Sequence, residues 1–98
     1  MDRNASIPIA LKLPRGTEVV GKVSKIAGAT RFFVKCADGK ERICTIPGRL
    51  RRRFWIKIND VVIVKPWVVQ SDERGDITWR YSMMDIGKLR AKGILANL

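Results

Sequence analysis

The thirteen residues from Ile46 to Ile58 form the stretch whose residue types and spacing most strongly indicate a chemical role. Five of them are cationic and none is anionic, and the adjacent aromatic residues Phe54 and Trp55 directly follow three arginines. An arginine guanidinium can hold a phosphate through two parallel hydrogen bonds and can stack its face on a base. Aromatic rings stack on unpaired bases of any identity. The stretch therefore predicts a surface that binds nucleic acid, and we interpret its target as RNA.

A second interpretation of the same stretch is a solvated basic loop whose aromatic residues cover one end of the folded domain. Leu50, Phe54 and Ile56 are expected to belong to the core rather than to the RNA contact. The remaining cationic and aromatic residues of the stretch are the predicted RNA ligands: Arg49, Arg51, Arg52, Arg53, Trp55 and Lys57.

A strand is predicted over 31–36, where apolar and polar residues alternate. The inward face is apolar and consists of Phe32, Val34 and Cys36. The outward face is basic and aromatic and adds three predicted RNA ligands: Arg31, Phe33 and Lys35. A strand face of this composition suits a nucleic-acid platform. The alternative is that Phe33 covers a neighbouring strand.

The next strand, predicted over 41–46, should pair with 31–36 through a three-residue turn, Ala37-Asp38-Gly39. This length places Phe32 opposite Cys44, so that both core faces point the same way, as pairing register requires. Gly39 is then the left-handed bulge residue. The same parity puts Arg42 on the core side of its strand. We expect it at the rim of the folded domain, with its guanidinium in solvent.

Three further strands are predicted, over 17–27, 61–65 and 76–81. In the first, Val19, Gly21 and Val23 share a face, and Gly21 indicates a bulge or bend. The run 61–65 is apolar on both faces and should be covered on both. In the last, one face holds Ile77, Trp79 and Tyr81. A helix over 83–93 follows, capped by Ser82, with one stripe of Met83, Ile86, Leu89 and Arg90.

Five short strands with a long connection between the third and fourth indicate an all-β, five-stranded Greek-key OB-fold barrel with a short C-terminal helix. That fold binds oligonucleotides on its second and third strands and on adjacent loops. We expect a flexible basic arm over 1–14, the RNA-binding barrel over 15–81, and a C-terminal helix and tail over 82–98.

Composition narrows the classes of function. The 98 residues suit one domain and carry a formal net charge of +11, which favours polyanions. There is no histidine, the carboxylates are scattered, and two cysteines cannot complete a structural zinc site. We therefore expect no enzyme, metal or cofactor. No run of eighteen apolar residues is present, so we expect nothing that spans a membrane. The N-terminal residues lack the long apolar stretch of a signal peptide. We expect a cytoplasmic, monomeric protein without a membrane partner.

The segment from Arg42 to Ile56 closely resembles the signature of translation initiation factor 1A, in its archaeal and eukaryotic form. The segments Asp60–Trp67 and Asp76–Tyr81 continue the resemblance in the same order and spacing. Together these blocks extend the resemblance over about residues 17 to 90.

The resemblance implies an OB-fold protein, without a cofactor, that binds ribosomal RNA at the A site of the small ribosomal subunit. Members promote recruitment of initiator transfer RNA and messenger RNA and help the subunits dissociate, and other initiation factors are possible partners. The family's first loop, here Gly28 to Arg31, inserts against the RNA. The signature basic residues and tryptophan correspond to Arg49, Arg51, Arg52, Arg53 and Trp55.

The sequence departs from the family pattern in three places. Ala29 stands where the family often has asparagine, and Arg49 stands where lysine is usual. The chain ends at Leu98 without the acidic tail of the eukaryotic forms, so the resemblance is to the archaeal form. A general single-stranded RNA-binding protein or RNA chaperone is the alternative function. Such proteins often carry several aromatic residues on the binding strands, whereas Phe33 is the outward one predicted here.

Overall fold

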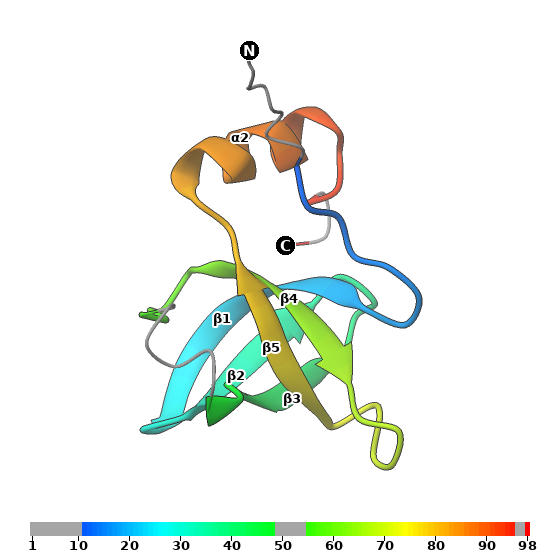
Figure 1. The fold of residues 1–98 in the computed structure, drawn as a ribbon, viewed down its shortest axis with the longest axis vertical. Helices are drawn as coiled ribbons and strands as arrows, with labels where there is room; N and C mark the ends of the chain where they lie inside the picture. Colours follow the sequence, from blue (N-terminus) through cyan, green and yellow to red (C-terminus); the bar gives the residue numbers. More distant parts are fainter. Residues whose placement is uncertain (1–10, 49–54, 96–97) are drawn as a thin grey trace.

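A computed structural model describes residues 11–48, 55–95 and 98. Its strands are β1 (Val19–Gly28), β2 (Arg31–Cys36), β3 (Glu41–Thr45), β4 (Val61–Pro66) and β5 (Arg74–Arg80), and its helix is α2 (Met83–Ala91). The strands close into a barrel in the order β1-β2-β3-β5-β4, with β3 and β5 parallel and the other neighbours antiparallel. Figure 1 shows α2 above one end of the barrel. The predicted five-stranded OB-fold barrel with a C-terminal helix is confirmed.

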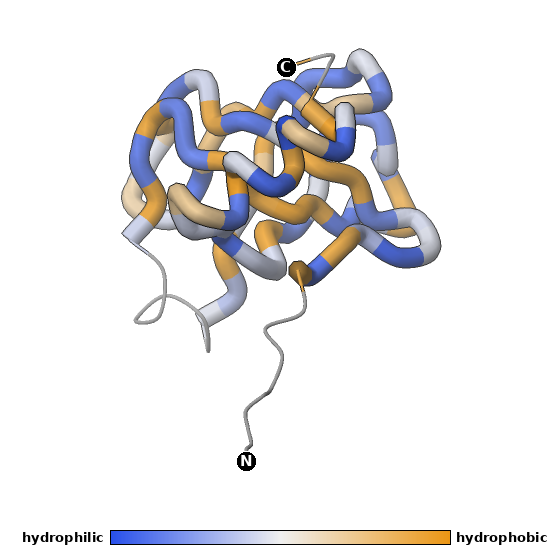
Figure 2. The backbone as a smooth tube through the Cα atoms, turned by 90° about the horizontal axis from the view of Figure 1, so that it is seen from above, coloured by the Kyte–Doolittle hydropathy of each residue, from blue (hydrophilic) through white to orange (hydrophobic). Residues whose placement is uncertain are grey.

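Alternation along the strands fills the barrel interior with apolar side chains. Figure 2 shows hydrophobic and hydrophilic positions succeeding one another along the chain. The inward positions form one buried cluster: Val23, Phe32, Val34, Cys36, Cys44, Ile46, Val62, Val64 and Ile77. Period-two patterning therefore separates a core face from a solvent face, as it does in antiparallel sheets generally.

β4 is apolar on both faces because it is covered on both, as predicted. Val62 and Val64 point into the barrel, whereas Val61 and Ile63 belong to a second cluster outside it. That cluster is completed by residues of β1, of the end of β5 and the residue after it, of α2, and of the segments at the two ends of the described chain: Val20, Tyr81, Leu89, Leu95, Leu11, Trp79, Ile86, Ile94 and Leu98. The helix therefore covers the outer side of Val20 on β1 and of Val61 and Ile63 on β4.

Residues 11 and 12, from the C-terminal end of the expected arm, contact this second layer. The Tyr81 hydroxyl donates a hydrogen bond to the Lys12 carbonyl, and the Lys12 ammonium lies 5.1 Å from the centre of the Trp79 ring.

Among the described residues, no helix is long and apolar enough to cross a membrane.

The predicted register of the β2–β3 hairpin is confirmed. Phe32 lies opposite Cys44 and Lys35 opposite Glu41, which leaves a three-residue turn. Gly39 has φ of 87°, a conformation that costs glycine little and other residues more. Parity of the core faces was therefore sufficient to select the turn length.

The expectation that Arg42 has its head in solvent is wrong. Its side chain is 3% exposed, and its guanidinium donates hydrogen bonds to both Asp38 carboxylate oxygens, at 3.1 and 2.9 Å. Its Nε donates to the Ser71 carbonyl. The turn and the β4–β5 connection supply these acceptors together, so the charge is buried with partners instead of projecting into water.

Gly21 does not mark a bulge. The register of β1 against β2 is continuous there and shifts between Val23 and Lys25 instead. A Cβ at Gly21 would lie 2.4 Å from Val34 Cγ1. The glycine is therefore needed for close approach of two strands rather than for a break in pairing.

The expectation that Ile77, Trp79 and Tyr81 share one face is also wrong. Trp79 pairs with Ile63 and Ile77 with Val64, with a register shift between the two pairs. One extra residue in β5 reverses the alternation, so Ile77 enters the barrel core while Trp79 and Tyr81 join the outer layer.

The helix begins as predicted, because the Ser82 hydroxyl accepts a hydrogen bond from the Asp85 amide. It ends at Ala91, and Gly93 follows with φ of 75°. The predicted apolar stripe is partly wrong: Leu89 is buried, but Met83 is 86% exposed and Arg90 is exposed. Met83 belongs to the first turn and lies away from the outer layer of the barrel.

Candidate nucleic-acid interface

The outward face of β2 carries the three predicted ligands of this strand. Arg31 and Lys35 are exposed, and Phe33 is half-buried. Phe33 lies opposite Ile43 on β3, and the Lys25 ammonium lies 5.6 Å from the centre of its ring. The ring therefore both covers the neighbouring strand and forms part of a cationic surface, so the two interpretations of Phe33 are compatible.

Lys25 reaches Phe33 because of an irregularity in β1. The register passes from Val23–Val34 to Lys25–Phe33, so that Ser24 is the extra residue. Without that bulge, Lys25 would fall on the opposite side of the strand from its present position. Sequence alternation gave no signal for this contact, because a single inserted residue changes parity without changing residue type.

Two lysines lie directly opposite each other on the outer face of β1 and β2. Lys22 is the register partner of Lys35, an arrangement that is destabilising for like charges across strands. Within the described part of the chain, neither lysine forms an ion pair. Glu41, which lies opposite Lys35 on β3, accepts a 2.9 Å hydrogen bond from the Ser24 hydroxyl. This cationic pair is therefore available to a negatively charged ligand.

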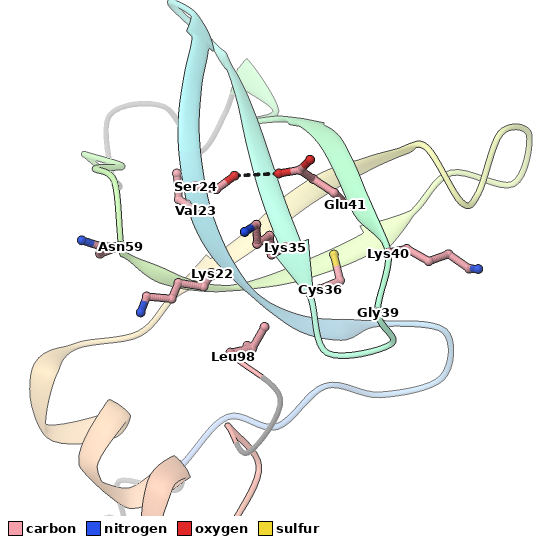
Figure 3. Close-up of a pocket in the computed structure, with 10 residues that line it drawn as sticks. All are labelled: Lys22, Val23, Ser24, Lys35, Cys36, Gly39, Lys40, Glu41, Asn59 and Leu98. Atoms are coloured by element: carbon pink, nitrogen blue, oxygen red, sulfur yellow. Dashed lines mark hydrogen bonds between the residues drawn. The ribbon is translucent and has the colours of Figure 1, made fainter.

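A hollow of about 590 Å³ surrounds this pair and gathers a third lysine, Lys40, from the β2–β3 turn. In Figure 3, Lys22 and Lys40 extend outward on opposite sides of the hollow and Lys35 lies between them. Asn59 and Leu98 also line it. Lys22 and Lys40 were not among the predicted ligands. The outward parity of Lys22 was a usable signal, but its opposition to Lys35 required the pairing of β1 with β2.

The connection between β3 and β4 carries the other predicted ligands, and both of its ends are fixed to the barrel. Ile46 belongs to the barrel core and Ile56 packs against it, as expected for Ile56. Between them, Arg49, Arg51, Arg52 and Arg53 lie outside the described residues, as do Leu50 and Phe54. The position of the triple arginine relative to the strands therefore stays a prediction.

Trp55 and Lys57 are the predicted RNA ligands of this connection that the structure describes. Both are exposed, Trp55 to 77%. The backbone that follows them is held by Asp60, whose carboxylate accepts a hydrogen bond from the Lys57 amide at 2.7 Å and from Arg80 at 3.0 Å. Asn59 adopts φ of 76° within this turn, and its amide donates to the Val23 carbonyl. The turn thus fixes the segment beside β1.

Carboxylates also lie on this face. Glu41 lines the lysine hollow and, with Glu73, a second hollow that is completed by Phe33, Ile43, Gln70 and Arg74. Carboxylates disfavour a phosphate backbone, whereas lysines favour one. The β3 side of the face is therefore of mixed charge, and the excess of positive charge lies with the lysines of β1 and β2.

The two cysteines offer no reactive thiol to this surface, although Cys36 is among the residues that line the lysine hollow. Both are free and buried, as expected. Burial raises the pKa of the Cys36 thiol and raises the pKa of Cys44 to about 12. The thiols are therefore protonated at neutral pH and are poor metal ligands and nucleophiles.

A closed five-stranded barrel with this strand order defines an OB-fold protein. The family model described as translation initiation factor 1A / IF-1 matches residues 9–97. The chain belongs to this family.

Archaeal relatives cover most of the chain. Translation initiation factor 1A of Pyrococcus abyssi is 51% identical over 85 residues, which are 87% of this chain and 75% of the relative. Translation initiation factor 1A 1 of Haloquadratum walsbyi is 49% identical, over 85% of each chain. Alignments of this length include the strands and the basic connection, so the resemblance that the sequence indicated is confirmed.

Solved structures share the barrel. A translation initiation factor from the Wolbachia endosymbiont of Brugia malayi has a TM-score of 0.53 and 32% identity, covering 67% of this chain and 78% of that one. YjeQ from Thermotoga maritima has a TM-score of 0.54 at 19% identity, covering 66% of this chain and 23% of that one. The second likeness shows the fold alone.

Proposed function

We propose that this initiation factor binds ribosomal RNA at the A site of the small ribosomal subunit. There it promotes recruitment of initiator transfer RNA and messenger RNA and helps the subunits dissociate. It acts by binding, without catalysing a reaction, as a cytoplasmic monomer. Family membership supports the translational role, and the cationic face of the barrel supports RNA as the ligand.

The observation that carries the proposal is the direct opposition of Lys22 and Lys35 on the outer face. A like-charge pair costs the folded protein stability, and an RNA phosphate between the two ammonium groups would remove that cost. Arg31 and Phe33 continue the same face, which gives a phosphate-binding line beside a stacking ring. Trp55 and Lys57 extend the proposed surface from the β3–β4 connection.

The experiment is co-sedimentation with purified archaeal small ribosomal subunits at moderate salt, with free ribosomal RNA of equal mass as competitor. We expect saturable one-to-one binding that resists the competitor, since a site built into the subunit offers more than phosphate charge. Binding that the competitor abolishes would instead support the general single-stranded RNA-binding function, in which charge acts without a dedicated site.

The central arginines are tested by replacing Arg51, Arg52 and Arg53 with alanine. Losing three phosphate contacts should lower the slope of log K against log salt by about two to three units, at roughly 0.7 to 0.9 per contact. The matched control replaces Lys65, Lys88 and Lys92, which are exposed and line no hollow together with Lys22, so that the same charge is removed at another place. An unchanged slope in the arginine variant would remove this segment from the site.

A further inference from the structure

The connection between β4 and β5, residues 67–73, differs in charge from the rest of the chain. It contains Asp72 and Glu73 and no lysine or arginine, in a protein with a net charge of +11. Figure 1 shows this β4–β5 loop projecting from the end of the barrel remote from α2. In OB folds this loop commonly contributes to oligonucleotide binding, but two carboxylates at its base repel phosphate.

The tip of the loop is apolar and uncovered. Val68 is 100% exposed and Val69 is 74% exposed, and Trp67 beside them is 37% exposed. Single exposed apolar residues are common on protein surfaces. Two adjacent valines on a projecting tip form a compact apolar feature that another surface could bury, and valine offers no ring for base stacking.

The conformation of the loop is fixed by contacts at its base. The Trp67 indole donates to Asp76 Oδ1 at 3.0 Å, and the Arg74 guanidinium lies 5.8 Å from the Trp67 ring centre. The Gln70 carbonyl accepts hydrogen bonds from the Glu73 and Arg74 amides.

Two further contacts join the loop to the β2–β3 hairpin. Buried Arg42 donates to the Ser71 carbonyl, and Lys40 lies 3.6 Å from the Asp72 carboxylate. A loop held in this way loses little conformational freedom on binding, which favours affinity. The valine tip is therefore presented in a set position rather than folding on contact.

We propose that the β4–β5 loop is a protein-docking element that inserts Val68 and Val69 into an apolar hollow rimmed by cationic side chains, on a protein of the small ribosomal subunit. Charge complementarity indicates the partner, because Glu73 and Asp72, which is also 3.6 Å from Lys40, lie at the base of the loop, where they match a basic protein surface and oppose RNA. The inference rests on the proposed binding to the small subunit. Under this proposal the lysines of β1 and β2 bind RNA, and the β4–β5 loop binds protein.

The first test is the double variant Val68→Ser, Val69→Ser, assayed against purified archaeal small subunits and against free ribosomal RNA. We expect roughly tenfold or greater loss of affinity for subunits, from the buried apolar area that is removed, and unchanged affinity for free RNA. The matched control is Met83→Ser, Met84→Ser, which removes another exposed apolar pair and should bind subunits normally. Equal subunit affinity of the valine variant and the wild type would overturn the proposal.

A cation placed at the tip of the loop distinguishes protein from RNA by the sign of its effect. Val68→Lys should weaken binding to subunits if the tip enters an apolar hollow rimmed by cations, and should tighten it if the tip faces phosphate. Tighter subunit binding would overturn the proposal in favour of an RNA contact.

A photo-crosslinking amino acid at position 68 reports the neighbour directly. We expect an adduct with subunits that protease removes and nuclease does not. An adduct with RNA, or none, would overturn the proposal. Failure of the wild-type protein to bind subunits would instead contradict the proposed function, so the two failures are distinguishable.

Discussion

Arg42 and Asp38 form a two-pronged ion pair across the β2–β3 turn, with guanidinium-to-carboxylate distances of 3.1 and 2.9 Å. Arg42 also donates to the Ser71 carbonyl, 29 positions along the chain. One buried cation thus joins the hairpin turn to the β4–β5 loop. This contact decides how both connections sit at that end of the barrel.

Replacing Asp38 by asparagine should lower the free energy of unfolding at pH 7 by about 2 kcal/mol, since it weakens charge-assisted bonds to a buried partner. Denaturant titration measures this change. Asp72→Asn is the control: Asp72 contacts exposed Lys40 at 3.6 Å, and such a pair contributes about 0 to 1 kcal/mol. Equal effects of the two substitutions would contradict the role given to Asp38.

The same pair predicts a pH dependence. The hydrogen bond from Arg42 lowers the pKa of Asp38 below its ordinary 3.8. The ionised carboxylate therefore stabilises the fold above pH 3.8, and this contribution is lost as the pH falls toward the lowered pKa. We expect wild-type stability to approach that of the asparagine variant in acid. A constant difference between pH 7 and pH 2 would contradict this.

Gly21→Ala should destabilise the barrel by about 1 to 3 kcal/mol, the usual cost of overpacking a core. The added Cβ would lie 2.4 Å from Val34 Cγ1, and Val34 is fully buried. Gly28→Ala is the matched control, because nothing lies within 4 Å of its Cβ position. Thermal unfolding of both variants should separate them clearly. A neutral Gly21→Ala variant would show that the two strands can move apart freely.

Lys22→Gln should change stability and RNA affinity in opposite directions. Removing one of two opposed lysines should raise the free energy of unfolding by about 0.2 to 1 kcal/mol. Losing one phosphate contact should lower the salt slope of RNA binding by about 0.7 to 0.9. The control Lys88→Gln, on the helix, should change neither quantity. Reduced stability together with an unchanged slope would place Lys22 outside the RNA surface.

Trp55→Ala should weaken RNA binding by about 1 to 3 kcal/mol, the value of one stacked base. The free energy of unfolding of the Trp55→Ala variant should differ from that of the wild type by no more than about 0.5 kcal/mol, because the indole is 77% exposed. Ile56→Ala, which removes a side chain packed on the core, should instead lose about 2 kcal/mol of stability. Calorimetry and RNA titration of both variants test this contrast. Loss of cooperative unfolding in the tryptophan variant would assign Trp55 to the core.

Local pattern predicted much of the fold, and the physical reason is that strand parity and caps depend on near neighbours. Apolar and polar residues alternate along the two strands, and matching their core faces pairs Phe32 with Cys44. This pairing was enough to predict the hairpin register and the left-handed conformation of Gly39 in the turn. Ser82 was recognisable as a helix cap because its partner, Asp85, is three residues away. The basic-aromatic composition of the outer β2 face was also visible without coordinates.

Tertiary structure alone decided features that depend on how the barrel closes. The extra residue in β1 places Lys25 opposite Phe33, and the extra residue in β5 places Trp79 in the outer layer. Such bulges bend a strand so that the barrel can close, and the residue types alone do not indicate where they occur. Arg42 is buried because Asp38 and Ser71 converge on it from two connections. The sequence by itself therefore determined the strands, the hairpin register and the family. Closure of the barrel determined which charges are opposed and which are paired, because those relationships join residues from different strands.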